Sequence, residues 1–357
     1  MAKENKKDNL PSVVTGTQLY ETRKNRPVIT SNLSFDIACS GGIPKGCTVL
    51  CGGKYKSGKT TLALKYLAAA QKLFKMKGFV YNIEGRLDNK VLDQTNDLEL
   101  DNLSVISGSD IKDENGEVVG NKKQPAQWWW DIIGENLTNF PGSFHIVDSI
   151  SALSDESELA ETMGYQSRGG LQKLEAQFCR KFGDIIVPSG TIIFLLAQIQ
   201  ANTSGQGEAT QIKAGNSIRH LADAIIFIKW IEKWQPNSDG KILGHNLKCK
   251  IESSPLGSPY MECDVPLRYG VGIDNVKDVM NHCINWEIIK ANGAWYDLPF
   301  LKPEKETDKP VFVDLDKLPK DTKPIKLQGE ENVRSWLVSH PSETAMLEGM
   351  IRKQVLG

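Results

Sequence analysis

Short apolar runs alternate with stretches of helical periodicity from about Val28 to about Arg268. Apolar runs of this length, bounded by polar residues, are typical of buried strands. The clearest are residues 47–51, 78–83, 143–147, 191–197 and 224–231. Residues 60–74 place apolar side chains at helical spacing, at positions 62, 64, 66, 67 and 70. Buried strands separated by helices predict an α/β fold with a mostly parallel sheet covered on both faces.

The pattern is different outside this region. Residues 1–27 are polar and contain Pro11, Gly16 and Pro27, so we expect an arm there. A smaller α+β unit is expected after Arg268, with an amphipathic stretch at 276–291 and two helical patterns at 333–356 broken at Pro341. The Pro- and Lys-rich residues 299–324 between them predict an exposed excursion. The expected organisation is therefore an arm (1–27), a core (28–268) and a C-terminal domain (269–357).

Two polar stretches interrupt the core pattern. Residues 107–125 and 201–214 contain Gly and charged or amide side chains and few bulky apolar groups. Long polar segments inside a compact domain are usually functional loops or insertions. The Trp run at 128–130 lies in a helical pattern and has two interpretations, base stacking or burial in the core. Because Ile132 and Ile133 extend the apolar face, burial is favoured.

Composition sets limits on partners and location. The chain has 357 residues, 40% of them hydrophobic, and a formal net charge of −1, so it is no bulk polycation. Nucleic-acid binding would need a local basic surface or backbone N–H groups. No run of 18 apolar residues exists and the lysine-rich N-terminus lacks a signal-peptide core, so we expect a cytoplasmic protein without membrane contact.

The cysteines indicate a reducing compartment and structural roles. None forms a C-x-x-C pair or a Cys/His cluster with zinc spacing. They are Cys39, Cys47, Cys51, Cys179, Cys249, Cys263 and Cys283.

Residues 53–60 read GKYKSGKT and match the P-loop pattern G-x-x-x-x-G-K-[ST], with a strand pattern before it and a helix pattern after it. The glycines let the backbone wrap closely around phosphate. The loop N–H groups and the helix N-terminus present positive charge to its oxygens. Lys59 is expected to reach the terminal phosphates, and the Thr60 hydroxyl is a candidate ligand of Mg²⁺.

Two carboxylates complete the candidate phosphate chemistry. Asp148 ends an apolar strand pattern about 90 residues after the P-loop, where a P-loop NTPase holds magnesium directly or through water. Glu84 follows the strand pattern 78–83 and is a candidate general base that activates water. A surface turn residue is an equally good interpretation of Glu84 from its position alone.

Several segments together resemble the RecA recombinase family, in its order and spacing. They are 51–64 (CGGKYKSGKTTLAL), 82–88 (NIEGRLD), 146–153 (IVDSISAL), 194–199 (FLLAQI), 215–218 (GNSI), 247–253 (LKCKIES), 267–270 (LRYG), 293–296 (GAWY) and the end, 331–356. The resemblance covers residues from about 28 to 357, with two insertions. It implies an ATPase that uses Mg²⁺, forms helical filaments on single-stranded DNA and pairs it with double-stranded DNA.

The resemblance also implies roles for matching residues. The ATP-binding set is Gly53, Lys54, Tyr55, Lys56, Ser57, Gly58, Lys59, Thr60, Thr61 and Asp88, and Thr60 and Asp148 hold the metal. Glu84 becomes the catalytic carboxylate and Gln198 the sensor of the γ-phosphate. Lys248 and Lys250 match lysines that reach the ATP of a neighbouring subunit. Without the resemblance, a solvated strand face would be the better interpretation of these two lysines.

Two loops would carry DNA, at about 155–170 and 200–215. The candidate contacts are Arg168, Gly169, Lys173, Arg180, Gln200, Asn202, Thr210, Lys213, Ala214, Gly215 and Asn216. Lys173 and Arg180 lie seven apart and so share one helix face. The end of the second loop, 214–216, would donate backbone N–H groups to phosphates.

Departures from the family pattern keep other functions open. The second loop has one Lys and one Glu, Val91 stands where an aromatic residue stacks on adenine, Tyr55 replaces a carboxylate and His220 an aromatic residue. They suggest a phage or mobile-element member. ATP-dependent DNA strand exchange is the favoured function. The alternatives are a filament-forming regulator or scaffold without strand exchange, and a hexameric helicase-type motor.

Overall fold

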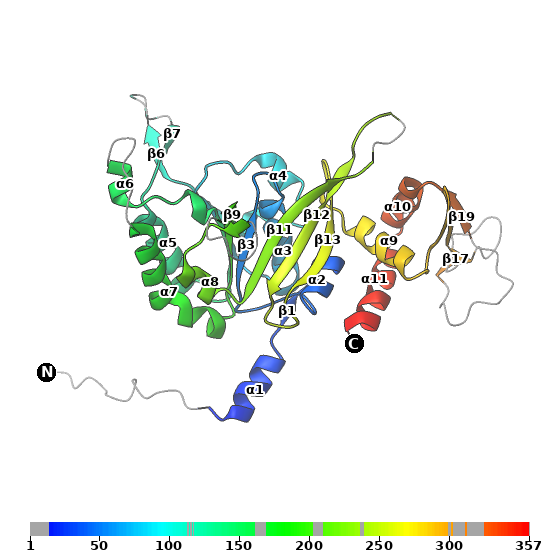
Figure 1. Ribbon diagram of the computed structural model, residues 1–357, viewed down its shortest axis with the longest axis horizontal. Coiled ribbons are helices and arrows are strands. Elements are labelled where there is room, and N and C mark those ends of the chain that lie inside the picture. Colours follow the sequence, from blue (N-terminus) through cyan, green and yellow to red (C-terminus); the bar gives the residue numbers. More distant parts are fainter. Residues whose placement is uncertain are drawn as a thin grey trace.

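The structure is a computed structural model that describes residues 14–112, 114, 116, 118–160, 169–202, 210–235, 239–298, 301–302, 311–312 and 325–356. A large twisted sheet lies at the centre, with helices on both of its faces, and a smaller unit follows at the C-terminal end (Figure 1). The helix α1 projects away from the sheet (Figure 1).

The central sheet has the order β14-β13-β12-β11-β3-β9-β8-β4-β5, and β10 pairs with β9. From β11 to β5 all neighbours are parallel, while β10, β12, β13 and β14 are antiparallel additions. Its strands are β3 (Thr48–Gly53), β4 (Gly78–Asn82), β5 (Leu103–Ile106), β8 (Phe144–Asp148), β9 (Ile192–Ala201), β10 (Thr210–Ile212), β11 (Ala224–Lys233), β12 (Gly244–Ser253), β13 (Met261–Arg268) and β14 (Gly272–Ile273). The predicted α/β class with a mostly parallel sheet is confirmed.

Alternate residues of the buried strands pack into two separate hydrophobic cores. On β3, Val49 and Cys51 pack with the helix α3 in one cluster, whereas Leu50 packs into the cluster on the opposite face. This alternation follows from the period of two in a strand. The helices of the core are α3 (Lys59–Phe74), α4 (Asn89–Asp93), α5 (Ala126–Asn139), α6 (Glu156–Ala160), α7 (Gly170–Ser189) and α8 (Asn216–Leu221), with 3₁₀ turns at Leu100–Asn102 and Ile150–Ala152.

A third core lies in the C-terminal part and includes Leu33 of the N-terminal region. This part is built from α9 (Asn275–Asn285), β15 (Lys290–Asn292), β16 (Trp295–Leu298), β17 (Leu301–Lys302), β18 (Val311–Phe312), β19 (Ile325–Gln328), α10 (Glu330–Ser339) and α11 (Pro341–Leu356). Polar bonds tie it to the helix α2 (Leu33–Ala38): Ser34 Oγ donates to Asp278 at 2.5 Å, and Arg352 pairs with buried Asp36 at 2.7 Å. The C-terminal part is therefore anchored on the first elements of the core.

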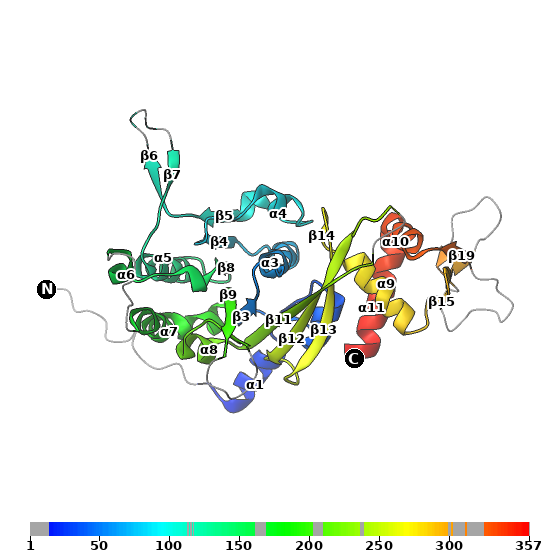
Figure 2. The ribbon, with the colours of Figure 1, turned by 45° about the horizontal axis from the view of Figure 1, so that its top comes forward.

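The two polar stretches of the core contain regular structure. Residues 107–125 include an antiparallel hairpin, β6 (Ser109–Lys112) and β7 (Val118–Lys122), which stands out from the sheet (Figure 2). At the second stretch, β9 runs on to Ala201 and β10 pairs back against it, so its ends are strands and not loop. Both differ from the sequence-based expectation because exposed hairpins need backbone pairing and not apolar side chains.

Three smaller expectations can be compared directly. Of the Trp run, Trp129 and Trp130 are buried, as packing predicted. The amphipathic stretch 276–291 forms a helix as far as Asn285, and residues 290–292 form a strand. The expected excursion 299–324 lies largely outside the described residues, apart from β17 and β18.

The N-terminal region is partly regular. The helix α1 (Gly16–Lys24) is capped by Thr15 and buries no residue, and β1 (Val28–Ile29) pairs with β2 (Ile43–Pro44). Residues 1–13 lie outside the described part. Within the described residues, no helix combines the length and the apolar character that crossing a bilayer requires.

Candidate active site

The P-loop joins β3 to α3, and its backbone is built for close approach to a ligand. Gly58 has φ of 84°, in the left-handed region that favours glycine. A Cβ on Gly53 would lie 2.5 Å from Ser57 Oγ, so a larger residue here would displace that hydroxyl. The helix α3 then begins at Lys59 and directs its N-terminus into the loop. These features give a cradle of N–H groups suited to phosphate oxygens.

Lys59 is the cation of this cradle. Its ammonium group donates to the carbonyl oxygens of Gly53 (3.1 Å) and Lys54 (2.9 Å), which holds it inside the loop. Burial lowers the pKa of Lys59, and the nearby Asp148 and Glu84 oppose that shift. An anion added to the cradle would favour the charged ammonium further.

Thr60 and Asp148 bring two oxygen ligands together. Thr60 Oγ1 donates to Asp148 Oδ2 at 2.7 Å, although the residues are 88 positions apart. Burial raises the pKa of Asp148, and the bond from Thr60 counteracts the shift. A hydroxyl and a carboxylate beside a phosphate cradle are the donors that Mg²⁺ takes in such sites, with phosphate oxygens and water as its other ligands. The residues present therefore fit ATP with Mg²⁺.

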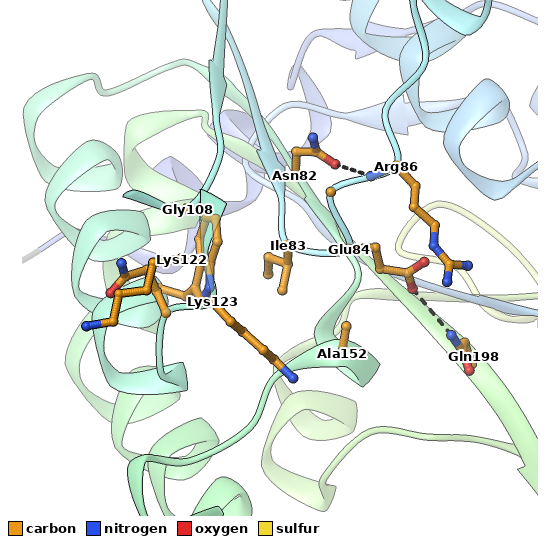
Figure 3. Close-up of a pocket in the computed structure, with 12 residues that line it drawn as sticks. Asn82, Ile83, Glu84, Arg86, Gly108, Lys122, Lys123, Ala152 and Gln198 are labelled. Atoms are coloured by element: carbon orange, nitrogen blue, oxygen red, sulfur yellow. Dashed lines mark hydrogen bonds between the residues drawn. The ribbon is translucent and has the colours of Figure 1, made fainter. Parts of the chain in front are cut away.

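Glu84 lies between two strand ends, where β4 and β8 are in register at Asn82 and Asp148. Its Oε1 accepts from Ser149 Oγ at 2.6 Å and from Gln198 Nε2 at 3.3 Å. Figure 3 shows the second bond, which joins the end of β4 to β9. The carboxylate is thus positioned by its neighbours, and Gln198 is linked to it directly.

The sequence-predicted residues gather around one cavity of about 460 Å³, which we call the nucleotide cavity. Its lining includes Tyr55, Lys56, Ser57, Gly58, Lys59, Thr60, Thr61, Glu84, Asp88, Asp148 and Gln198. Gly53 and Lys54 adjoin it through their bonds with Lys59. Asp88 caps α4 by accepting from the backbone N–H of Lys90 at 2.9 Å, and Val91 also lines the wall. One cavity thus combines the cradle, the metal ligands and the candidate base.

Two contributors were missed from the sequence. Arg86 lines the nucleotide cavity, and its guanidinium carbon lies 5.5 Å from the ring centroid of Tyr55. Ser149 donates to Glu84, as described above. Arg86 stands in the segment NIEGRLD and Ser149 directly follows Asp148, so both residues lie in segments that resemble the RecA family. Only the folded arrangement brings their side chains to the site.

Lys248 and Lys250 lie on β12, outside the lining of the nucleotide cavity. Lys248 pairs with Asp264 (2.5 Å) and Glu232 (3.1 Å), and the hydrogen bond that it donates to Asp264 is the main reason why its pKa is raised. Lys250 Nζ lies 5.3 Å from the ring centroid of Tyr260.

The candidate DNA residues of the first loop are only partly described. Arg168 lies outside the described residues. Gly169 is the N-cap of α7, and Lys173 and Arg180 are exposed on that helix. Asp155 is buried and accepts from Ser157 Oγ and from the N–H of Glu158, so its carboxylate does not face outward as a repulsive charge.

The second loop differs in detail from the expectation. Gln200, Asn202 and Thr210 lie on or beside the β9–β10 hairpin, and 203–209 lie outside the described residues. Lys213 is exposed, and Asn216 begins the short helix α8. The N–H groups of Ala214 and Gly215 already donate to Ile212 O and Glu175 Oε2. The expected donation of these two groups to phosphates would require those bonds to break.

Glu175 is the buried partner of the second loop. Its Oε2 lies 3.0 Å from the Gly215 nitrogen, and a Cβ on Gly215 would lie 2.1 Å from that oxygen. Burial raises the pKa of Glu175 to about 7, and the bond from Gly215 lowers it only in part. The loop is therefore fastened to α7 through a carboxyl group that titrates near neutral pH.

Comparison with known proteins gives one consistent result. The family model described as the RecA N-terminal domain matches residues 12–274. Protein RecA of Ruminococcus albus is 25% identical over 327 residues, or 90% of this chain and 71% of the relative. Protein RecA of Legionella pneumophila is 28% identical over 340 residues (94% and 85%), and that of Methylococcus capsulatus 26% over 331 (92% and 83%).

Proposed function

The chain belongs to the RecA family, and from that premise we propose that it is an ATP-dependent DNA recombinase. It assembles as a helical filament on single-stranded DNA, pairs that strand with homologous double-stranded DNA and exchanges strands. ATP and Mg²⁺ are its cofactors. The proposed organisation is an arm (1–27), an ATPase core (28–268) and a DNA-associated C-terminal domain (269–357), and the proposed location is the bacterial cytoplasm.

The hydrogen bond between Gln198 and Glu84 is the observation that carries this proposal. Gln198 lies on β9, the strand that continues into the proposed second DNA loop, and Glu84 is the candidate base. A side chain that contacts both the terminal phosphate and the general base couples ATP hydrolysis directly to the loop that follows it. Whether that loop is ordered then depends on the bound nucleotide, as in other phosphate-controlled switches.

The residues of the site have different roles in ATP hydrolysis. The P-loop N–H groups and Lys59 hold the phosphates, while Thr60 and Asp148 hold Mg²⁺, which when bound neutralises phosphate charge. Glu84 orients a water molecule and accepts its proton as the water attacks the γ-phosphorus, and the bond to the β–γ bridging oxygen breaks. Lys248 and Lys250 of a neighbouring copy stabilise the charge that develops on the transferred phosphoryl group. Hydrolysis thereby depends on assembly.

Two observations favour an alternative, a RecA-like filament-forming ATPase that regulates or scaffolds without strand exchange. The sequence between 200 and 215 carries no net charge, and the Gly215 N–H is engaged with Glu175. Both weaken the case for phosphate contacts at this loop. The lysine pair and the C-terminal part, with its own core, favour the recombinase.

The deciding experiment measures ATPase rate with and without single-stranded DNA, at low and high salt. A large stimulation that salt suppresses is expected, because salt weakens contacts to phosphates. Strand exchange between a circular single strand and a linear duplex is then assayed. Stimulated hydrolysis without exchange would favour the regulator. A sound basal rate that DNA leaves unchanged would overturn DNA coupling altogether.

A further inference from the structure

A second cavity adjoins the nucleotide cavity at Glu84, and no P-loop residue is part of its lining. Its volume is about 420 Å³, and it shares Asn82, Glu84, Arg86 and Gln198 with the nucleotide cavity. The rest of its lining includes residues at the base of the β6–β7 hairpin and Ala152. Figure 3 shows these residues around the cavity, which we call the hairpin cavity.

The charge of the hairpin cavity is mainly positive. Lys122, Lys123 and Arg86 line it together with a single carboxylate, Glu84. In Figure 3 the Lys123 side chain extends toward Ala152, and Arg86 lies on the opposite side beyond Glu84. Within the described part of the chain, neither Lys123 nor Arg86 has a carboxylate partner. Two cations thus face one concave space from two sides.

The glutamate offsets only one of these three positive charges. Glu84 Oε1 accepts hydrogen bonds from Ser149 and Gln198. The Arg86 guanidinium stacks on Tyr55, an arrangement that leaves its N–H edge available to an anion. The cations of the cavity therefore lack a negatively charged hydrogen-bond acceptor, such as a phosphate group.

The cavity also lies where both proposed DNA loops begin. Lys123 Nζ donates to Ser154 Oγ at 3.2 Å, and the Ala126 N–H donates to Ser154 O at 2.8 Å, which ties the hairpin base to the root of the first loop. Gln198, whose backbone N–H donates to Ser151 Oγ at 2.8 Å, lies at the root of the second loop. A ligand here would touch both roots and the candidate base together.

We propose that the hairpin cavity binds a backbone phosphate of single-stranded DNA, through Lys123 and Arg86 with Lys122 at its rim. The inference rests on the proposed function, because only a strand that follows the two loops would reach the cavity. It assigns a DNA contact to the 107–125 stretch, which neither the P-loop nor the two loops include. It also gives DNA a direct route to Glu84, independent of the neutral second loop.

The experiment measures the affinity of the full chain, held with a non-hydrolysable ATP analogue, for a fluorescent oligothymidine over a salt series. For single strands, each phosphate contact contributes about 0.7 to the slope of log K against log salt. The double variant K122Q/K123Q is expected to lower that slope by about 0.7 to 1.4. K123R keeps the charge and should keep the slope. K72Q, on α3 at the end far from the P-loop, is the matched control and should behave as wild type.

Inorganic pyrophosphate, titrated into the same proteins, separates DNA from a free anion as the source of the phosphate. A double variant that loses pyrophosphate binding while its DNA slope is unchanged would show a free-anion site and overturn the proposal. An unchanged slope with no pyrophosphate binding would overturn it as well, with the recombinase function intact. Wild-type protein that fails to bind the oligonucleotide at any salt would instead refute the proposed function. An ATP-induced rise in Tm checks that each variant is folded.

Discussion

At the scale of single residues, Glu84 is the position on which turnover depends. A glutamine there can still accept hydrogen bonds from Ser149 and Gln198 but cannot take a proton from water. We expect E84Q to bind ATP within a few-fold of wild type and to lose at least about 100-fold in turnover, the usual contribution of a general base. Nucleotide binding and single-turnover hydrolysis measure the two effects separately. Turnover that survives in E84Q would mean that another group is the base, and E99Q, at a part-exposed carboxylate that pairs with Lys75, is the control.

Tyr55 and Arg86 allow a second test at this scale. The ring supports the guanidinium at the nucleotide cavity, and an exposed cation–π contact contributes about 0.5–1 kcal/mol. Y55A should therefore weaken ATP binding about two- to fivefold, whereas Y55F keeps the ring and should bind as wild type. Binding of a fluorescent ATP analogue measures both. Equal weakening in the two variants would implicate the phenol hydroxyl and not the stacked ring.

Motifs in the sequence predicted those residues whose chemistry lies in one short segment. The P-loop residues, Asp148 and Asp88 fall around one cavity in the structure because each follows or begins a regular element. Arg86 and Ser149 escaped prediction for the opposite reason. Their contacts depend on the register of β4 with β8 and on the position of Tyr55, which no local pattern encodes.

At the scale of elements, the fastening of the second loop to α7 should depend on pH. The pKa of Glu175 is about 7 in the folded protein against an ordinary value of 4.5. A raised pKa means stability that is fully present below about pH 4.5 and is lost as pH rises through 7, because the charged form is penalised by burial. E175Q keeps an acceptor for the Gly215 N–H without the charge. It should be more stable than wild type at pH 8, by up to about 3 kcal/mol, and similar at pH 4.5.

Urea unfolding at both pH values measures this difference. E158Q, on the exposed helix α6, is the control and should change stability little at either pH. A stability gain in E175Q that is the same at pH 4.5 and pH 8 would show that the carboxyl group does not titrate in this range, and that the gain has another cause.

The burial of an element decides how clearly its sequence predicts it. The parallel strands β3, β4, β8, β9 and β11 are continuous apolar runs because both faces are covered. Strand β12 alternates instead: Lys248 and Lys250 are part-exposed while Cys249 between them is buried. A solvated strand face was therefore one interpretation of its sequence, beside the family motif. The amphipathic stretch 276–291 did not show where α9 ends, because Ile288 and Ile289 continue its apolar spacing although the helix ends at Asn285.

At the scale of the whole molecule, the C-terminal part is attached through a few buried polar contacts. Asp36 on α2 accepts from Tyr66 at 2.6 Å and pairs with Arg352 on α11, and its side chain is fully buried. The boundary at 268/269 stays a prediction, and β14 beyond it still pairs with β13 in the central sheet. Composition and periodicity predicted a second unit here, but the contacts that hold it, Ser34–Asp278 and Asp36–Arg352, join residues 244 and 316 positions apart, which a linear pattern does not show.

Assembly is the last property that the molecule needs for the proposed chemistry, and two inactive variants can test it together. E84Q retains Lys250 but lacks the base, and K250A retains the base but lacks the lysine. In a head-to-tail filament each site combines one protomer's Glu84 with its neighbour's Lys250, so an equal mixture should restore roughly a quarter of the sites. ATPase rates of each variant alone and of the mixture, with single-stranded DNA, measure the recovery. A mixture no more active than its components would place both residues in the same protomer and refute the role of Lys250 across the interface.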